Sequence, residues 1–387
     1  MNQNIKYEKN KIVLAITDSV SATLIEGQCN FLMNNGYKVA VFSSKGSEIL
    51  KLQKKEKFIL FEIYFVREIN LIKDFYALIS TVISLYKFRP DIVNSGTPKA
   101  GILLMIASFI IRTPIRIFTF RGLRSETLTG SKKHIVRFME KASCLLSTHV
   151  IAISPSLKLQ LENESIVKKG KCIVLAKGSS NGVDINRFSL NNPDLNFDNK
   201  IKSVSNEYVI GYVGRLVLDK GLMELYQAFL RLKSYCQIKL VIIGGYEYQN
   251  KLPVDFINNL EHDKNVEMLG EIIDVENYYP SFDVLVLPSH REGFGNVILE
   301  AAAMNIPSIA SNIPGIQDAV EDHVTGLLFK VHSESDLYLK LKYYFDNPEI
   351  RKKHGIDAQY RAKKYFSNKN IWNEQLEFYR KCTDKTN

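Results

Sequence analysis

Residues 283–303 read DVLVLPSHREGFGNVILEAAA and join a strand, a loop and a helix. After Asp283, the run 284–287 is continuously apolar, which is typical of a strand buried in a parallel sheet. Gly293 and Gly295 then let the backbone approach a bound group, and the helix that follows ends before Pro307. The first amides of a helix have no partner within it and attract an anion, most naturally a phosphate. The stretch therefore predicts an α/β fold with a phosphate site at a strand end.

Two glutamates flank this loop. Glu292 lies at its mouth, and Glu300 lies about two turns into the helix, so both side chains are able to face one bound molecule. A carboxylate beside a phosphate site is best explained by contacts to hydroxyl groups. We therefore expect a ligand with both a phosphate and a sugar. A helix start with ordinary side-chain capping is the simpler alternative.

The bulk composition predicts a soluble protein of two domains. The chain has 387 residues, of which 45% are hydrophobic and 24% are charged. The longest apolar run, 100–111, is too short to span a bilayer, and residues 1–9 lack the apolar core of a signal peptide. The five cysteines have no CxxC or metal-ligand spacing. These features favour a cytoplasmic location and free thiols.

The charge is concentrated in the first half of the chain. Residues 1–180 carry a net charge of +14 and the remainder −4. Many of the cations lie in the segment 112–141, interleaved with apolar residues. This pattern favours contact with an anionic membrane surface or a diphosphate-bearing partner. Nucleic acid would suit the charge but no recognition motif is present, and a solvated lysine-rich face is the plain alternative.

Strand and helix signals alternate through both halves, which predicts two doubly wound, mostly parallel sheets. We expect a first domain at 1–189, a polar linker at 190–206 and a second domain at 207–365. Ligands in such sheets bind beyond the carboxyl ends of the strands, so the expected site is a cleft between the domains. The strands are expected at 11–16, 38–42, 58–66, 91–94, 115–120, 150–153, 208–213, 239–243, 265–269, 284–287 and 308–310. The helices are expected at 24–34, 75–88, 98–111, 132–146, 221–233 and 371–381.

A second motif, GYVGRLVLDKG at 211–221, places two cations after a strand. Arg215 follows Gly214 directly, and Lys220 stands at the start of the next helix. Together they are suited to clamp one diphosphate, the arginine as a planar fork and the lysine as a point charge. Either cation alone would be explained as an ordinary charged residue on the protein surface. Further candidates at strand ends are Gly244, Gly270 and Glu271.

These motifs together resemble the retaining glycosyltransferases of family four, which have the two-Rossmann GT-B fold. The resemblance rests on GRLVLDKG, LGEI and PSHREGFGNVILEA in the second half and covers nearly the whole chain. In the first half, the segments 97–101, 119–126 and 148–155 resemble bacterial members that act on polyprenyl-diphosphate-linked sugars in O-antigen, capsule or glycan assembly. The family resemblance implies that the C-terminal helix, 366–387, crosses back onto the first domain.

The resemblance also implies roles for individual residues. Arg215 and Lys220 would bind the donor diphosphate, and Glu300 would hold the ribose hydroxyls. Glu292 would face the donor sugar hydroxyls, or the phosphate and acceptor side. The phosphate would be held by backbone amides of the loop. The family transfers sugar with retention, generally without a divalent metal, and no Asp-x-Asp motif is present here. The donor-side loop set is Gly293, Phe294, Gly295 and Asn296.

The chain departs from the family pattern at two places. Residues 17–22 contain no glycine where many members have a glycine-rich loop, and Arg121 stands where many have a histidine. Arg121 is therefore a candidate for contact with the lipid diphosphate or the donor sugar, with Arg124 and Lys99 as further acceptor-side candidates. No ligand cluster is expected among six of the histidines, namely His134, His149, His262, His323, His332 and His354. His290, two residues before Glu292, is within reach of the cleft but is more simply a loop residue. No metal or cofactor is expected.

The leading hypothesis is a retaining, metal-independent glycosyltransferase, peripheral on the inner face of the cytoplasmic membrane. It would move an N-acetylhexosamine or deoxyhexose from a UDP-linked donor to a polyprenyl-diphosphate-linked acceptor in surface polysaccharide synthesis. A nucleotide-sugar epimerase is an alternative, although it needs an acid/base pair that the chain does not clearly offer. A non-catalytic partner subunit is another alternative. A dehydrogenase is disfavoured because no GxGxxG motif follows the first strand.

Overall fold

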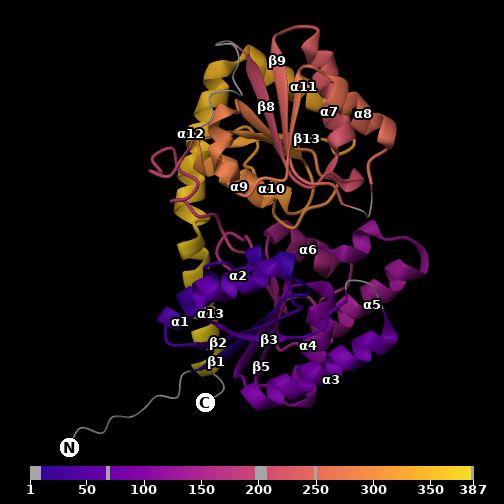
Figure 1. Cartoon of the computed structure of the whole chain (residues 1–387), viewed down its shortest axis with the longest axis vertical. Helices are drawn as coiled ribbons and strands as arrows, with labels where there is room; N and C mark the ends of the chain where they lie inside the picture. Colours follow the sequence, from indigo (N-terminus) through magenta and orange to yellow (C-terminus); the bar gives the residue numbers. More distant parts are fainter. Residues whose placement is uncertain (1–9, 67–69, 197–206, 248–250, 385–387) are drawn as a thin grey trace, which may run out of the picture. The chain divides into compact units, whose positions relative to one another are not determined.

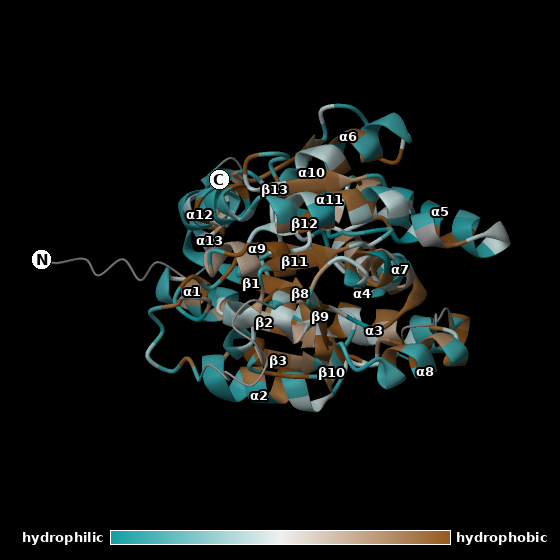
Figure 2. Cartoon of the chain, turned by 90° about the horizontal axis from the view of Figure 1, so that it is seen from above, coloured by the Kyte–Doolittle hydropathy of each residue, from teal (hydrophilic) through white to brown (hydrophobic). Residues whose placement is uncertain are grey.

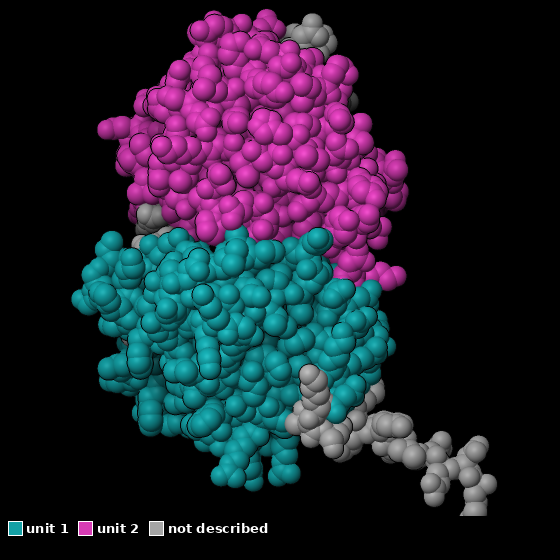
Figure 3. All heavy atoms as spheres, turned by 180° about the vertical axis from the view of Figure 1, so that it is seen from behind, with its two compact units in different colours: residues 1–181, 371–387 teal, residues 182–370 magenta. Residues whose placement is uncertain are grey.

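The computed structural model describes residues 10–66, 70–196, 207–247 and 251–384. The described chain forms two compact units, residues 1–181 with 371–387 and residues 182–370 (Figure 3). The boundaries expected from the sequence were 189/190 and 365/366. The expected linker, 190–206, lies partly outside the described residues.

The first unit is built on a seven-stranded sheet in the order β3-β2-β1-β4-β5-β6-β7, and every pairing is parallel. The first six strands follow the order typical of a Rossmann fold, in which the chain starts at the middle and winds outward in both directions. The strands are β1 (Lys11–Ala15), β2 (Lys38–Ser43), β3 (Ile59–Glu62), β4 (Ile92–Ser95), β5 (Ile115–Phe120), β6 (His149–Ala152) and β7 (Cys172–Ile173). The helices are α1 (Gln28–Asn34), α2 (Ser47–Glu56), α3 (Leu71–Phe88), α4 (Pro98–Ile110), α5 (Gly130–Leu146), α6 (Pro155–Asn163) and α13 (Asn368–Asp384), with 3₁₀ turns η1 (Ser19–Leu24) and η2 (Arg124–Thr127).

Helices cover both faces of this sheet (Figure 1). Ile12 and Leu14 of β1 share one buried cluster with side chains of α1, α2 and α13. Val13 and Ala15 point to the other face and are equally buried. Burial on both faces explains why the strands are continuously apolar rather than alternating, and Figure 2 shows them as mostly brown, hydrophobic ribbons.

The helix expected at 24–34 is interrupted in the structure. η1 ends at Leu24, and α1 begins only at Gln28, after Gly27 at φ 77°. A side chain on Gly27 would meet the ring of Trp372 at 2.3 Å, and the Gly27 amide donates to the Glu56 carboxylate at 2.6 Å. The break is therefore imposed by partners distant in the sequence. The strand expected at 58–66 is also shorter, and α2 and β7 were not anticipated.

The second unit repeats the architecture with a six-stranded parallel sheet in the order β10-β9-β8-β11-β12-β13. The expected fold class, two doubly wound Rossmann-like domains, is confirmed. The strands are β8 (Tyr208–Val213), β9 (Ile238–Ile243), β10 (Val266–Gly270), β11 (Val284–Leu287), β12 (Ser308–Ser311) and β13 (Gly326–Phe329). The helices are α7 (Leu222–Lys233), α8 (Val254–His262), α9 (Asn296–Ala303), α10 (Ile316–Ala319), α11 (Glu334–Asp346) and α12 (Pro348–Tyr365), with 3₁₀ turns η3 (Leu218–Lys220), η4 (Val275–Asn277) and η5 (Tyr279–Ser281).

All five cysteines are free thiols, as expected, and four of them are buried. Burial raises the pKa of Cys144 and of Cys172 to about 12 in each case. Because the thiolate is the reactive form, these side chains act as small apolar core residues at neutral pH.

Candidate functional site: the carboxyl edge of the second sheet

The expected donor residues lie at the switch point of the second sheet. β8 and β11 are neighbours, but the chain leaves β8 towards β9 on one side and β11 towards β12 on the other. The connections after these two strands therefore diverge and leave room for a ligand beyond the strand ends. Gly214 and Arg215 directly follow β8, and the loop 288–295 follows β11.

Lys220 and Glu292 are brought together at this edge. Lys220 ends η3, and its Nζ contacts Glu292 Oε1 in an ion pair whose side chains are 12% and 19% exposed. Ser289 Oγ donates to the same carboxylate oxygen at 3.3 Å. The two residues lie 72 positions apart in the sequence, so their contact depends on the adjacency of β8 and β11. A largely desolvated ammonium at a strand edge is well placed to attract an anion.

Glycines allow the segments around this pair to touch. Gly221 is the N-cap residue of α7 at φ 66°, and a Cβ there would lie 2.0 Å from the carbonyl oxygen of Pro288. A Cβ on Gly244 would lie 1.8 Å from the carbonyl oxygen of Gly214. No side chain fits at either position, so glycine is required for the close packing of these strand ends.

Arg215 does not contact Lys220 or Glu292 through a described hydrogen bond but reaches another partner. Its Nη1 donates to Glu247 Oε2 at 2.8 Å, and the arginine side chain is 52% exposed. An ion pair this exposed contributes only about 0.2–1 kcal/mol, so a ligand phosphate displaces Glu247 at little cost. Gly270 and Glu271, at the end of β10, are both exposed.

Glu300 is held by a partner that no sequence motif indicated. Its Oε2 accepts a hydrogen bond from Tyr279 Oη at 2.7 Å. Burial raises the pKa of Glu300, and the Tyr279 bond acts in the opposite direction. Tyr279 is fully buried, and burial also raises the pKa of its phenol. The tyrosine orients the carboxylate and leaves it further acceptor capacity for a ligand.

The loop 288–295 contains Gly293 and Gly295, is called the glycine loop here, and leads into α9 without a side-chain cap. Gly295 occupies the N-cap position at φ 79°, and within the described part of the chain no side chain bonds to the first amides there. Ordinary capping is therefore not what the structure shows. Phe294 is buried, with its ring 5.3 Å from that of Phe366, so only its backbone is available to a ligand. Gly293 and Asn296 are half-buried on either side.

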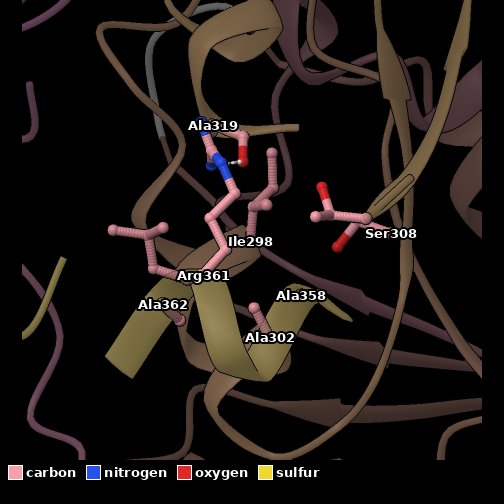
Figure 4. Close-up of a pocket in the computed structure, with 9 residues that line it drawn as sticks. Ile298, Ala302, Ser308, Ala319, Ala358, Arg361 and Ala362 are labelled. Carbon is pink, nitrogen blue, oxygen red and sulfur yellow. Dashed lines mark hydrogen bonds between the residues drawn. The ribbon is translucent and has the colours of Figure 1, made fainter. Parts of the chain in front are cut away.

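A small cavity is lined by side chains of α9, α10 and α12, and none of the donor-site candidates lines it (Figure 4). Its volume is about 10 Å³, which is enough for about one water molecule and too small for a sugar. Arg361 lines it and donates to the carbonyl oxygens of Ala319 and Asp318 at 2.7 Å each. These bonds attach α12 to α10, which gives the arginine a structural role.

Arg121, in the first unit, is a half-buried arginine whose guanidinium is short of partners. It follows β5, and its Nε and Nη1 are buried with no hydrogen bond to any described residue. Burial lowers its pKa to about 10. A side chain on Gly96 would meet Arg121 Nε at 2.5 Å, so the guanidinium packs across the end of β4. Buried charges normally have hydrogen-bonding partners, so this position is suited to an anionic ligand.

The other two acceptor-side candidates differ from Arg121. Lys99, in the first turn of α4, pairs with Asp74 of α3 at 2.8 Å, and both side chains are largely buried. This ion pair neutralises the charge of Lys99 within the fold. Arg124 begins η2 and is exposed. Their acceptor roles stay predictions.

A further cluster in the second unit was not anticipated, and it includes His332, for which the expectation of no ligand cluster was wrong. His290 Nε2 lies 2.7 Å from Glu224 Oε1, and His332 Nδ1 lies 3.5 Å from the same oxygen. The three residues come from separate segments with no motif spacing. Only their packing reveals the cluster.

Comparison with known proteins shows the family. Residues 194–361 match the family described as glycosyl transferases group 1, and residues 21–187 match glycosyltransferase family 4. The chain is 37% identical over 374 residues to the capsular polysaccharide biosynthesis glycosyltransferase CapM of Staphylococcus aureus, covering 96% of this chain and 97% of that protein.

Two more comparisons agree with this. A UDP-Gal:α-D-GlcNAc-diphosphoundecaprenol α-1,3-galactosyltransferase of Escherichia coli is 32% identical over 69% of each chain. The crystal structure of Anabaena HepE with UDP and glucose has the same fold, with a TM-score of 0.79, 18% identity and coverage of 96% of this chain and 99% of that one. Since family matches span both halves and a 37% identical relative aligns almost end to end, the chain belongs to glycosyltransferase family 4 and is a glycosyltransferase of the GT-B fold.

Proposed function

We propose that the protein transfers a sugar, with retention, from a UDP-linked donor to a polyprenyl-diphosphate-linked acceptor during capsule or related surface polysaccharide synthesis. The observation that carries the donor half is the Lys220–Glu292 pair at the switch point of the second sheet. The acceptor half rests on the relatives, two of which are named for diphosphoundecaprenol-linked substrates. An N-acetylhexosamine or a deoxyhexose is the proposed sugar.

The proposed chemistry needs charge stabilisation at the leaving group. The bond from the sugar anomeric carbon to the diphosphate oxygen breaks, and a bond from that carbon to the acceptor hydroxyl oxygen forms on the same face. The acceptor proton passes to the leaving phosphate oxygen. Lys220, Arg215 and the open amides of α9 stabilise the developing negative charge. Glu292 binds sugar hydroxyls as Lys220 turns from it to the phosphate.

Glu300 is proposed to hold the ribose. Its carboxylate is oriented by Tyr279 and lies on the helix whose first turn faces the phosphate. A carboxylate accepts hydrogen bonds from two neighbouring hydroxyls, which matches a ribose diol. No metal is assigned to this step.

A product assay tests the function. The protein is incubated with UDP-, GDP- and dTDP-sugars and a polyprenyl-diphosphate-linked monosaccharide, and the lipid product is identified by mass. We expect the lipid to gain one sugar from a UDP donor. Conversion of a nucleotide sugar without acceptor would identify an epimerase. Absence of any turnover with the whole panel would favour a non-catalytic subunit.

Arg121 is proposed to bind the acceptor diphosphate, which gives a prediction with opposite effects on stability and activity. Arg121→Met removes two buried N–H groups that have no described partner and keeps an apolar stem of similar length. We expect the free energy of unfolding to rise by about 1–3 kcal/mol, the cost of one unsatisfied buried group. Transfer efficiency for the lipid acceptor should fall at least about tenfold.

Arg116→Met is the matched control for this prediction. Arg116 is also partly buried, but its Nε and Nη1 donate to the carbonyl oxygens of Leu146 and Thr113 at 2.8 and 2.7 Å. Its replacement should destabilise the protein. A less stable Arg121→Met variant in urea denaturation would contradict the proposed role of Arg121.

We also propose that the first unit docks on the inner face of the cytoplasmic membrane. No helix within the described ranges is both long enough and apolar enough to cross a bilayer. α3 instead exposes an apolar stripe, and at about 100° per residue its positions fall within an arc of about 140°. The stripe consists of Leu71, Ile72, Phe75, Tyr76, Ile79, Ile83 and Tyr86, with exposed fractions of 41–82%.

Basic residues accompany the stripe. α4 packs against both α3 and α5, and α5 carries exposed lysines beside exposed apolar side chains. Phe138 and Leu145 of α5 are 72% and 80% exposed. Apolar side chains at the acyl boundary and lysines at anionic headgroups are the two components of interfacial binding.

Charged residues in the apolar stripe of α3 should weaken docking. In Leu71→Glu/Phe75→Glu, two anchors become anionic, and we expect at least about tenfold less binding to vesicles of anionic phospholipid. Glutamate is favourable at Leu71, the first residue of α3, and the side chain of Phe75 is 60% exposed, so α3 should stay folded. Leu339→Glu, on α11 of the second unit and 59% exposed at the wild-type side chain, is the control. Equal sedimentation of all three proteins with vesicles would refute the docking face.

A further inference from the structure

Glu224, His290 and His332 form a cluster with the composition of a metal site. One ligand atom from each residue, Glu224 Oε1, His290 Nε2 and His332 Nδ1, lies within 4.8 Å of the other two. Glu224 Oε1 lies 2.7 Å from His290 Nε2 and 3.5 Å from His332 Nδ1. In a tetrahedral zinc site with bonds of about 2.0 Å, neighbouring ligand atoms are about 3.3 Å apart. Small side-chain rotations are sufficient to surround an ion.

The three side chains are held by different parts of the second unit. Glu224 lies in the first turn of α7, where the backbone is helical. His290 lies in the loop after β11, and its amide donates to the carbonyl oxygen of Asp219 at 2.9 Å. His332 lies between β13 and α11 at φ 61°, a left-handed conformation that few residues other than glycine adopt. The backbone thus brings side chains from three separate segments to one point.

An ion pair alone explains this arrangement poorly. One protonated histidine is enough to satisfy Glu224, yet two imidazoles share its oxygen, with ring centroids 3.9 Å apart. Two imidazolium ions at that distance would repel each other. A nearby cation, Arg291, pairs with Asp219 at 3.6 Å and does not supply a charge to the glutamate. A divalent cation held by two neutral imidazoles and one carboxylate removes the conflict.

We propose that Glu224, His290 and His332 bind a borderline divalent cation of the Zn²⁺ class, with water as the fourth ligand. Two nitrogens and one oxygen suit Zn²⁺, Co²⁺ and Ni²⁺ better than Mg²⁺ or Ca²⁺, which prefer oxygen ligands. His332 is 63% exposed, so the ion and its water reach the site from solvent. This site goes beyond the proposed transfer reaction and does not rest on it.

A bound ion is expected to hold the glycine loop in place. His290 stands two positions before Glu292 in the loop that follows β11. A bound ion would link this loop to α7 and to the segment before α11. Because the unfolded chain lacks the site, binding should raise the unfolding temperature.

Titration of the full chain with Zn²⁺ tests the proposal. Isothermal calorimetry should show one ion per chain, and His332→Ala and Glu224→Gln should each weaken binding by at least about tenfold. Co²⁺ should give the visible bands of a four- or five-coordinate site without a thiolate charge-transfer band. The Zn²⁺-dependent rise in unfolding temperature should disappear in His332→Ala, whose transfer rate without added metal should stay unchanged.

His323→Ala is the matched control, since His323 is exposed in the same unit and lies 3.9 Å from the Asp322 carboxylate, where the described residues form no group of three metal ligands. It should bind Zn²⁺ as the wild type does. The proposal is overturned if the wild type binds no ion, if His332→Ala binds as tightly as His323→Ala, or if Co²⁺ shows a thiolate band, which would place the metal on cysteine.

Discussion

Replacing Lys220 by alanine should lower the turnover number for sugar transfer by about 10²–10³-fold, the loss seen when one preorganised charge-stabilising donor is removed from an active site. The ammonium is largely desolvated beside Glu292, where its interaction with a developing phosphate charge is stronger than in water. Steady-state kinetics with the donor identified in the product assay, together with UDP binding by calorimetry, measure the effect.

A matched variant separates catalysis from stability. Lys239 pairs with Glu267 at 2.6 Å, and its side chain is 15% exposed, close to the 12% of Lys220. Both residues of that pair lie near the starts of β9 and β10, at the opposite edge of the sheet from the proposed donor site. Lys239→Ala should therefore cost stability but not turnover. If Lys220→Ala kept its turnover within a factor of about three of the wild type, the donor-site assignment would fail.

Replacing Gly221 by alanine should reduce the free energy of unfolding by about 2–4 kcal/mol. Part of the loss, about 1–2 kcal/mol, comes from an alanine at a left-handed backbone position. The rest comes from overlap with the Pro288 carbonyl, which has to move together with the loop that carries Glu292. Urea denaturation measures the stability, and we also expect weaker UDP binding because Lys220 precedes this glycine.

Gly270→Ala separates the backbone penalty from the cost of overlap with the Pro288 carbonyl. Gly270 has φ 71°, close to the 66° of Gly221, and a Cβ added there would have no described atom within 4 Å. It should show the backbone penalty alone. Equal losses of stability in the two variants would mean that the approach to Pro288 is not a constraint.

The elements themselves were largely predictable. Apolar runs such as 284–287 and breakers such as Pro307 identified most strands and helices, because buried parallel strands and helix ends have local sequence signals. The chemical types of Lys220, Glu292 and Glu300 were also recognised locally, since each stands beside a strand end or a glycine turn. The roles assigned to them are predictions that the variants above test.

Contacts between distant segments were decided by the tertiary structure. The pairing of Lys220 with Glu292, the bond from Tyr279 to Glu300 and the break at Gly27 under Trp372 all join positions with no fixed spacing. The histidine cluster is of the same kind. The amino-acid sequence by itself determined where strands, turns and charged groups occur, because periodicity and turn chemistry act over a few residues. Only the folded sheet decided which of those groups meet, because strand order, not separation along the chain, sets their distances.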